Sequence, residues 1–170
     1  MAEATTSTEE PEFDIDPEKA AFFEGVEEIA HAIAQEGHTH GDFMNVQPEE
    51  LEAAYAQGCM FLNQRQWSKA EEMFKLGAYL DHYDERFWLG LGLARQQNKQ
   101  YMSAVNAYAV FVNLTPENPI ASFRAAECLI AANKPVEAEQ ALHAALAFCE
   151  DTPEHAQIQA RAEALLASLS

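Results

Sequence analysis

The sequence of 170 residues predicts an all-α protein in which pairs of antiparallel helices repeat along the chain. Two observations favour this fold class. Small and bulky apolar residues recur every 34 residues. The segments between them carry apolar residues at the spacing of a helix face. A fixed period of about 20–50 residues is typical of repeat proteins, in which each unit buries its apolar face against its neighbours.

Three sets of equivalent positions define the repeat. They are Gly58, Gly92 and Ala126; Ala70, Ala104 and Ala138; and Phe74, Tyr108 and Leu142. These sets divide residues 51–152 into the windows 51–84, 85–118 and 119–152, which are equal in length. The second window fits the tetratricopeptide pattern best, through Trp88, Leu91, Gly92, Ala104, Tyr108 and Pro116. Each window is therefore predicted to be one tetratricopeptide repeat of a superhelix, and its small residues would let the two helices approach closely.

The segment before the repeats is predicted to have two parts. Residues 1–16 are rich in Thr, Ser, Glu and Pro, which indicates an acidic disordered tail. Residues 17–50 are predicted to hold an N-terminal helix, which ends at Gly37, and a connector. One face of that helix is apolar, and it consists of Phe22, Phe23, Val26, Ile29 and Ile33. Because this stripe lies outside the repeat pattern, we expect it to bury against a second copy of the chain or against the back of the repeats.

The segment after the repeats, residues 153–170, is predicted to be one further amphipathic helix. Its apolar stripe consists of Ile158, Ala162, Leu165, Leu166 and Leu169. The end of a repeat array needs a cap with a polar outer face. We therefore expect this helix to cover the open face of the third repeat.

The charge of the chain is strongly negative and unevenly distributed. Lys and Arg number 10, Asp and Glu number 28, and the net charge is −18. Residues 1–54 carry 15 of the acids and a single base. This acidic segment is either a solvated tail or an arm that binds a basic partner. Such a chain is not expected to bind nucleic acid. The sequence shows no secretory leader and no apolar run of about 18 residues, which predicts a cytoplasmic protein without membrane insertion.

A stack of tetratricopeptide repeats curves, and the first helix of each pair lines the concave groove. Groove-facing residues are expected at the second, fifth, ninth and twelfth positions of each window. They are Glu52, Tyr55, Cys59 and Leu62; Arg86, Leu89, Leu93 and Gln96; and Ile120, Phe123, Glu127 and Ile130. Repeat proteins that bind a C-terminal carboxylate need Lys and Asn at the fifth and ninth positions. Here these positions hold Tyr55 and Cys59. The groove is therefore predicted to bind an extended apolar peptide through its side chains.

No residue pattern indicates catalysis. His31, His38, His40 and Asp42 lie close together in the sequence, but their spacing fits no established metal site. The three cysteines form no Cys-x-x-Cys pair, which favours a reducing compartment. Nucleotide-binding and hydrolase motifs are absent as well. We therefore expect no enzymatic activity, no cofactor and no metal.

The stretch LDHYDERFWLGLG at residues 80–92 resembles the class II chaperones of type III secretion systems. Tyr101 with Ala104 and Tyr108, and the run AAECL at residues 125–129, carry the same resemblance, which covers about residues 38–150. It implies a cytoplasmic chaperone of a Gram-negative bacterium with two hydrophobic translocator proteins as its cargo. Such a chaperone holds an extended N-terminal segment of the cargo in its groove and keeps the two cargos soluble, apart and competent for secretion.

The resemblance also implies an assembly state and a further partner. Members of this family often form homodimers through their N-terminal helices, here residues 17–36. Some act with a transcriptional activator after their cargo has been exported. The alternative function is a general tetratricopeptide-repeat scaffold or regulatory adaptor without chaperone activity, whose client would be soluble alone.

Overall fold

The computed structural model describes residues 37–149 and 153–169. The chain divides into two units, Met1–His38 and Thr39–Ser170, and the helices below belong to the second. The predicted tail at residues 1–16, the predicted helix at residues 17–36 and its apolar stripe lie outside the described residues.

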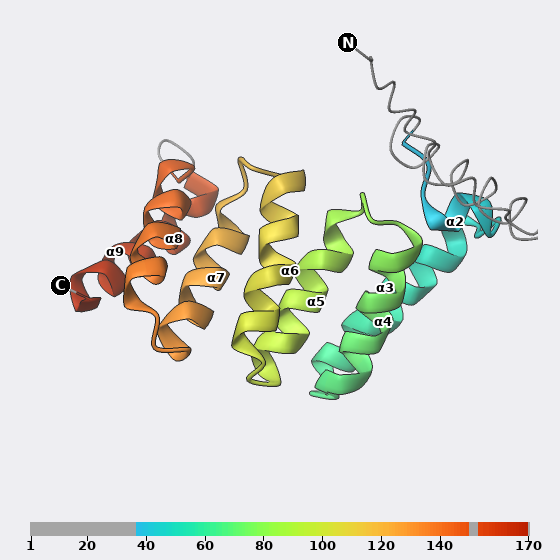
Figure 1. Ribbon diagram of the computed structural model, residues 1–170, viewed down its shortest axis with the longest axis horizontal. Coiled ribbons are helices and arrows are strands. Elements are labelled where there is room, and N and C mark those ends of the chain that lie inside the picture. The colour runs from blue at the N-terminus through green and yellow to red at the C-terminus, as the bar shows by residue number, and fades with distance from the viewer. Residues whose placement is uncertain (1–36, 150–152, 170) are drawn as a thin grey trace, which may run out of the picture. The chain divides into compact units, whose positions relative to one another are not determined.

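The described part of the second unit is a succession of helix pairs. A short helix, α2 (His40–Phe43), precedes the pairs α3 (Pro48–Asn63) with α4 (Trp67–Leu80), α5 (Glu85–Gln97) with α6 (Tyr101–Leu114), and α7 (Pro119–Ala131) with α8 (Pro135–Ala147), and a 3₁₀ turn at Pro153–His155 leads into α9 (Ala156–Leu169). From α3 to α9 each helix packs against the next one in the chain, as Figure 1 shows, and α2 packs against α4. The predicted all-α repeat fold is confirmed. None of the helices in the described residues is both long and apolar enough to span a membrane.

The turn inside each pair repeats the same backbone geometry. Arg65, Lys99 and Asn133, which occupy the same position in the three windows, adopt positive φ angles of 57°, 61° and 58°. At the first turn the Arg65 N–H donates to the Leu62 carbonyl at 3.0 Å, and the Gln66 N–H donates to the Phe61 carbonyl at 2.9 Å. This is a Schellman motif, which satisfies the last carbonyls of the helix. The other two turns have the equivalent bonds.

The core depends on close approaches between small and aromatic residues. Phe74 of α4 is fully buried. A Cβ atom added to Gly58 of the same pair would lie 2.7 Å from its ring, and one added to Gly90 of the next pair 2.5 Å from it. Gly92 faces the ring of Tyr108 in the same way. Gly58 and Gly92 thus lie where an aromatic ring joins one helix to another.

The last helix covers the third repeat. Ile158, Leu165, Leu166 and Leu169 of α9 pack against a buried cluster formed by α7 and α8, and Ala162 belongs to that cluster. The predicted capping helix is therefore confirmed. It follows a 3₁₀ turn, so its α-helical part begins at Ala156.

Candidate functional site

Polar side chains connect the first helices of successive pairs across one face of the second unit. Arg86 of α5 donates to Glu52 of α3 at 2.6 Å. Gln96 of α5 donates to Glu127 of α7 at 3.3 Å, and Arg161 of α9 donates to the other oxygen of Glu127 at 2.6 Å. We call the surface that α3, α5, α7 and α9 share through these contacts the first-helix face.

At the α3 end of this face, an arginine lies over an aromatic ring. The Arg86 guanidinium is 4.9 Å from the centroid of the Tyr55 ring. Arg86 also donates to Asp84 at 2.7 Å, and this hydrogen bond is the main cause of the raised Arg86 pKa. Tyr55 is half-buried against Phe74 and Phe87, and burial raises the pKa of its hydroxyl. The ring and the cation together form a cation–π contact at this end of the face, and the Arg86 side chain stays 41% exposed.

The α9 end repeats this arrangement with different residues. The Arg161 guanidinium lies 4.8 Å from the centroid of the Phe123 ring and pairs with Glu127. Glu127 and Arg161 are 34 residues apart, as are Glu52 and Arg86. Phe123, predicted to line the groove, is only 2% exposed. In this conformation Phe123 lies beneath Arg161 and presents almost no surface of its own.

A polar network occupies the centre of the face. The Tyr108 hydroxyl of α6 donates to the Gln96 side-chain carbonyl at 2.7 Å, and Gln96 in turn donates to Glu127. Arg124 donates to Glu127 at 3.0 Å. Burial raises the pKa of Tyr108, so its hydroxyl keeps its proton and remains a donor. These bonds fix α5, α6 and α7 to one another at the level of the predicted groove.

The other predicted groove residues differ in how much surface they present. Tyr55, Cys59 and Leu62 pack, half-buried, against the cluster around Phe74, and Leu89 and Ile120 pack against the cluster around Tyr108. Leu93 and Ile130 are half-buried too, but they are not among the side chains packed on the buried clusters of the described residues. Leu93 and Ile130 are therefore the half-buried apolar groove residues that do not pack on a buried cluster of the described residues.

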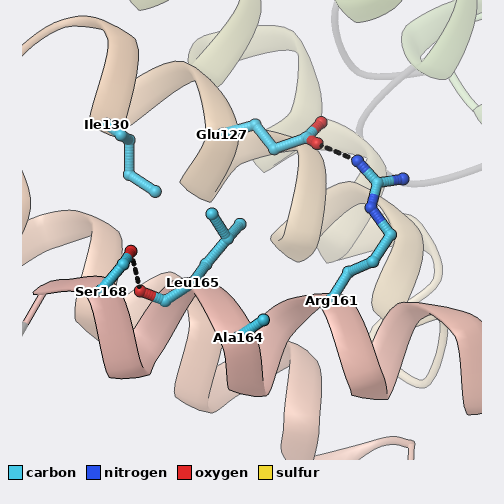
Figure 2. A pocket seen from close by; sticks show the side chains of 6 residues that line it. All are labelled: Glu127, Ile130, Arg161, Ala164, Leu165 and Ser168. Atoms are coloured by element: carbon cyan, nitrogen blue, oxygen red, sulfur yellow. Dashed lines mark hydrogen bonds and ion pairs between the residues drawn. The ribbon is translucent and has the colours of Figure 1, made fainter.

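A pocket of about 430 Å³ opens between α7 and α9 (Figure 2). It is lined by Glu127, Ile130, Arg161, Ala164, Leu165 and Ser168. Glu127 and Ile130 are groove residues predicted from the sequence, whereas the α9 residues lie beyond the third window, which ends at residue 152. The signal was present, since Arg161 follows Glu127 by one repeat length.

The candidate metal ligands near the start of the repeats do not converge in the structure. The His40 ring stacks on Tyr79 with centroids 4.6 Å apart. Asp42 forms a capping box with Thr39 at the start of α2, and His31 lies outside the described residues. Among the described residues, no three His, Cys, Asp or Glu side chains are grouped to hold a metal ion.

Comparison with known proteins defines the family. A tetratricopeptide-repeat family model matches residues 95–169. The chain is 31% identical to low calcium response locus protein H of Yersinia pseudotuberculosis over 133 residues, which cover 78% of this chain and 79% of that protein. It also matches the crystal structure of the type III secretion chaperone SycD of Yersinia enterocolitica with a peptide of the translocator YopD (TM-score 0.71, 31% identity, 73% of this chain and 95% of that chain). The chain belongs to the family of type III secretion translocator chaperones.

A third protein of this kind has been solved in two separate complexes. PcrH of Pseudomonas aeruginosa with the chaperone-binding region of PopD matches with a TM-score of 0.70 at 32% identity, covering 73% of this chain and 93% of that chain. PcrH with the corresponding region of PopB matches with a TM-score of 0.68 at 33% identity, covering 71% and 98%. The family predicted from the stretch at residues 80–92 is thereby confirmed.

Proposed function

We propose that this chain is a cytoplasmic, non-enzymatic chaperone of a type III secretion system. It binds two hydrophobic translocator proteins through an extended segment of each and keeps them soluble, apart and competent for secretion. The observation that carries the proposal is family membership together with solved relatives, SycD and PcrH, that hold translocator segments. The strongly acidic composition, with a net charge of −18, suits a protein that keeps apolar cargo in solution.

The first-helix face is the proposed cargo surface. Its apolar contacts come from Tyr55, Cys59, Leu62, Leu89, Leu93 and Ile130, its polar contacts come from Arg86, Gln96 and Glu127, and Phe123 supports the face from beneath Arg161. An extended peptide leaves backbone N–H and carbonyl groups free, which charged and amide side chains can satisfy. A short peptide buries little area, so a Kd on the order of micromolar is expected, weak enough for release at the secretion machine.

The proposed assembly is a homodimer formed through residues 17–36, with Phe22, Phe23, Val26, Ile29 and Ile33 at the contact. The amphipathic pattern of this segment supports the proposal, since a lone apolar stripe in water favours association. A transcriptional activator as a further partner stays a prediction from the family resemblance.

The function is tested by co-expression with the membrane-active proteins encoded beside this gene, followed by pull-down and size-exclusion chromatography with light scattering. The expected result is a soluble stoichiometric complex with a translocator that aggregates when expressed alone. Translocators that are soluble alone and do not co-purify would contradict the proposal and favour a scaffold.

The cargo surface is tested in the same complex with two matched substitutions. Leu93→Asp places a charge on the first-helix face, and Leu76→Asp places one on α4 at a residue that is 46% exposed. Binding is expected to fall at least tenfold for Leu93→Asp only, because a buried charge opposes an apolar contact. Equal binding by both variants would assign the cargo to another surface.

A further inference from the structure

The pocket between α7 and α9 lies where a fourth repeat would continue the first-helix face. Counting one repeat length onward places Ala160 at the small-residue position of Gly58, Gly92 and Ala126. The same count places Arg161 and Ala164 at the ninth and twelfth positions, which are predicted to face the groove in the three complete windows. Helix α9 thus caps the third repeat with one side and presents first-helix positions with another.

The pocket exists because the twelfth position is small in this last window. Leu62, Gln96 and Ile130 hold that position in the complete repeats, and Ala164 holds it in α9. A single methyl group cannot fill the space beside Ile130 and Leu165, and about 430 Å³ remains open. Ala164 is exposed and Leu165 and Ile130 are half-buried, so the hollow faces solvent.

The pocket wall is apolar, and its charged groups gather at one edge. The Ser168 hydroxyl donates to the Leu165 carbonyl at 2.7 Å (Figure 2). Its proton is therefore used within α9 and is not directed into the pocket. Glu127 and Arg161 pair at the edge and could contact the N–H and carbonyl groups of an extended backbone. An apolar hollow beside a mixed polar edge suits one apolar side chain of an extended peptide.

We infer that the pocket between α7 and α9 is a fourth subsite of the first-helix face and that it takes an aliphatic side chain of the bound translocator segment. The inference rests on the proposed function and extends it. The pocket is continuous with the proposed cargo surface, because Glu127 and Ile130 belong to both. A cargo segment that crosses α5 and then α7 on this face would therefore meet this pocket next.

The test combines pocket filling with peptide trimming. Overlapping synthetic peptides from the translocator encoded beside this gene first define the shortest segment that binds the full-length chain with full affinity. That segment is then shortened by three residues at either end. Ala164→Phe fills the pocket from an exposed helix position, and Ala144→Phe makes the same change at an exposed position of α8 as a control.

Ala164→Phe is expected to weaken binding of the full segment about tenfold or more, the effect of losing one buried aliphatic contact. Trimming one end should weaken binding to the wild-type chain by a similar factor, and trimming that end should have no further effect in Ala164→Phe. Ala144→Phe should bind every peptide as the wild-type chain does. The effects of Ala164→Phe and of trimming would then not add, which is expected when both changes remove the same contact.

Three outcomes would overturn the inference. If the two effects add in full, the trimmed residues bind elsewhere. If the full segment binds Ala164→Phe with wild-type affinity, the pocket is not used. If Ala164→Phe changes the molar mass of the peptide-free protein in light scattering, a second copy of the chain occupies the pocket.

A second variant and a binding control separate the remaining cases. Should Ala164→Phe melt at a lower temperature than Ala144→Phe, Ser168→Phe fills the pocket from a second exposed wall residue and must give the same loss. If no peptide binds the wild-type chain, the proposed function fails, and the inference fails with it. If peptides bind normally and neither filling variant alters their affinity, only the fourth subsite is lost.

Discussion

At the scale of single residues, the fold depends on glycines that leave room for aromatic rings. Gly92 faces the ring of fully buried Tyr108, which itself donates to Gln96 in the network of the first-helix face. Gly92→Ala is expected to lower the free energy of unfolding by about 1–3 kcal/mol, because the added Cβ forces α5 and α6 apart. Chemical denaturation would measure this change. Greater stability in the variant, as helix propensity alone would give, would contradict the close approach.

The reactivity of each cysteine thiol also depends on the surroundings of that single residue. Cys128 is fully buried, and burial raises the pKa of its thiol to about 12. Cys149 is buried as well, and burial raises its pKa too, whereas Cys59 is partly exposed. Since only the thiolate is nucleophilic, iodoacetamide at pH 8 should label Cys59 first and leave Cys128 and Cys149 unlabelled until the protein unfolds. Peptide mass spectrometry would locate the label, and early modification of Cys128 would contradict this burial.

At the scale of elements, the backbone geometry of the turns inside the helix pairs could not be predicted from the sequence. The left-handed position of a Schellman motif usually holds glycine, and here it holds Arg65, Lys99 and Asn133. Without the glycine signal, the geometry of these turns was not predictable from the chain. The turn between α4 and α5 carries a clearer sequence signal, because Asp is favoured at turns and N-caps. Asp81 accepts the Tyr83 N–H in this turn, and Asp84 accepts the Arg86 N–H at the start of α5.

The left-handed turns give a prediction with a matched control. Lys99→Gly is expected to stabilise the protein by about 1 kcal/mol relative to Lys99→Ala, because only the alanine side chain is strained at a φ of 61°. Both variants remove the same side chain, so the difference isolates the backbone. Thermal unfolding would measure it. Equal melting temperatures would mean that the turn relaxes to a negative φ without glycine.

A second prediction for the elements concerns the contacts that hold α9 against α7. Arg161 is joined to α7 by its ion pair with Glu127 and by its contact with Phe123. Arg161→Ala is expected to cost about 1 kcal/mol and to speed amide hydrogen exchange in α9, because a terminal helix opens locally. Arg86→Ala, at the other end of the face, serves as the control and should leave exchange in α9 unchanged. Equal acceleration of α9 by both variants would show that its docking depends on the whole array.

At the scale of the whole molecule, the constant repeat period made most of the fold predictable. It placed Arg86, Gln96 and Glu127 on one face, because each first helix repeats the orientation of the one before. It did not reveal that Arg86 pairs with Glu52, that Gln96 binds Glu127 or that Arg161 covers Phe123, since those contacts depend on side-chain reach between helices. Burial of Phe123 therefore depends on α9 as well as on its own repeat.

The assembly state is the prediction that belongs to the whole molecule. In the full-length chain, Phe23→Asp with Ile29→Asp should convert a dimer into a monomer in light scattering, because two charges in an apolar contact oppose association. Leu76→Asp, on the exposed surface of α4, should leave the mass unchanged. If the stripe packs on the repeats of its own chain instead, the wild-type protein is already a monomer, and the double variant keeps that mass while melting at a lower temperature. An unchanged dimer mass would place the contact outside residues 17–36, and cargo binding by the monomeric variant would show that one chain carries a complete first-helix face.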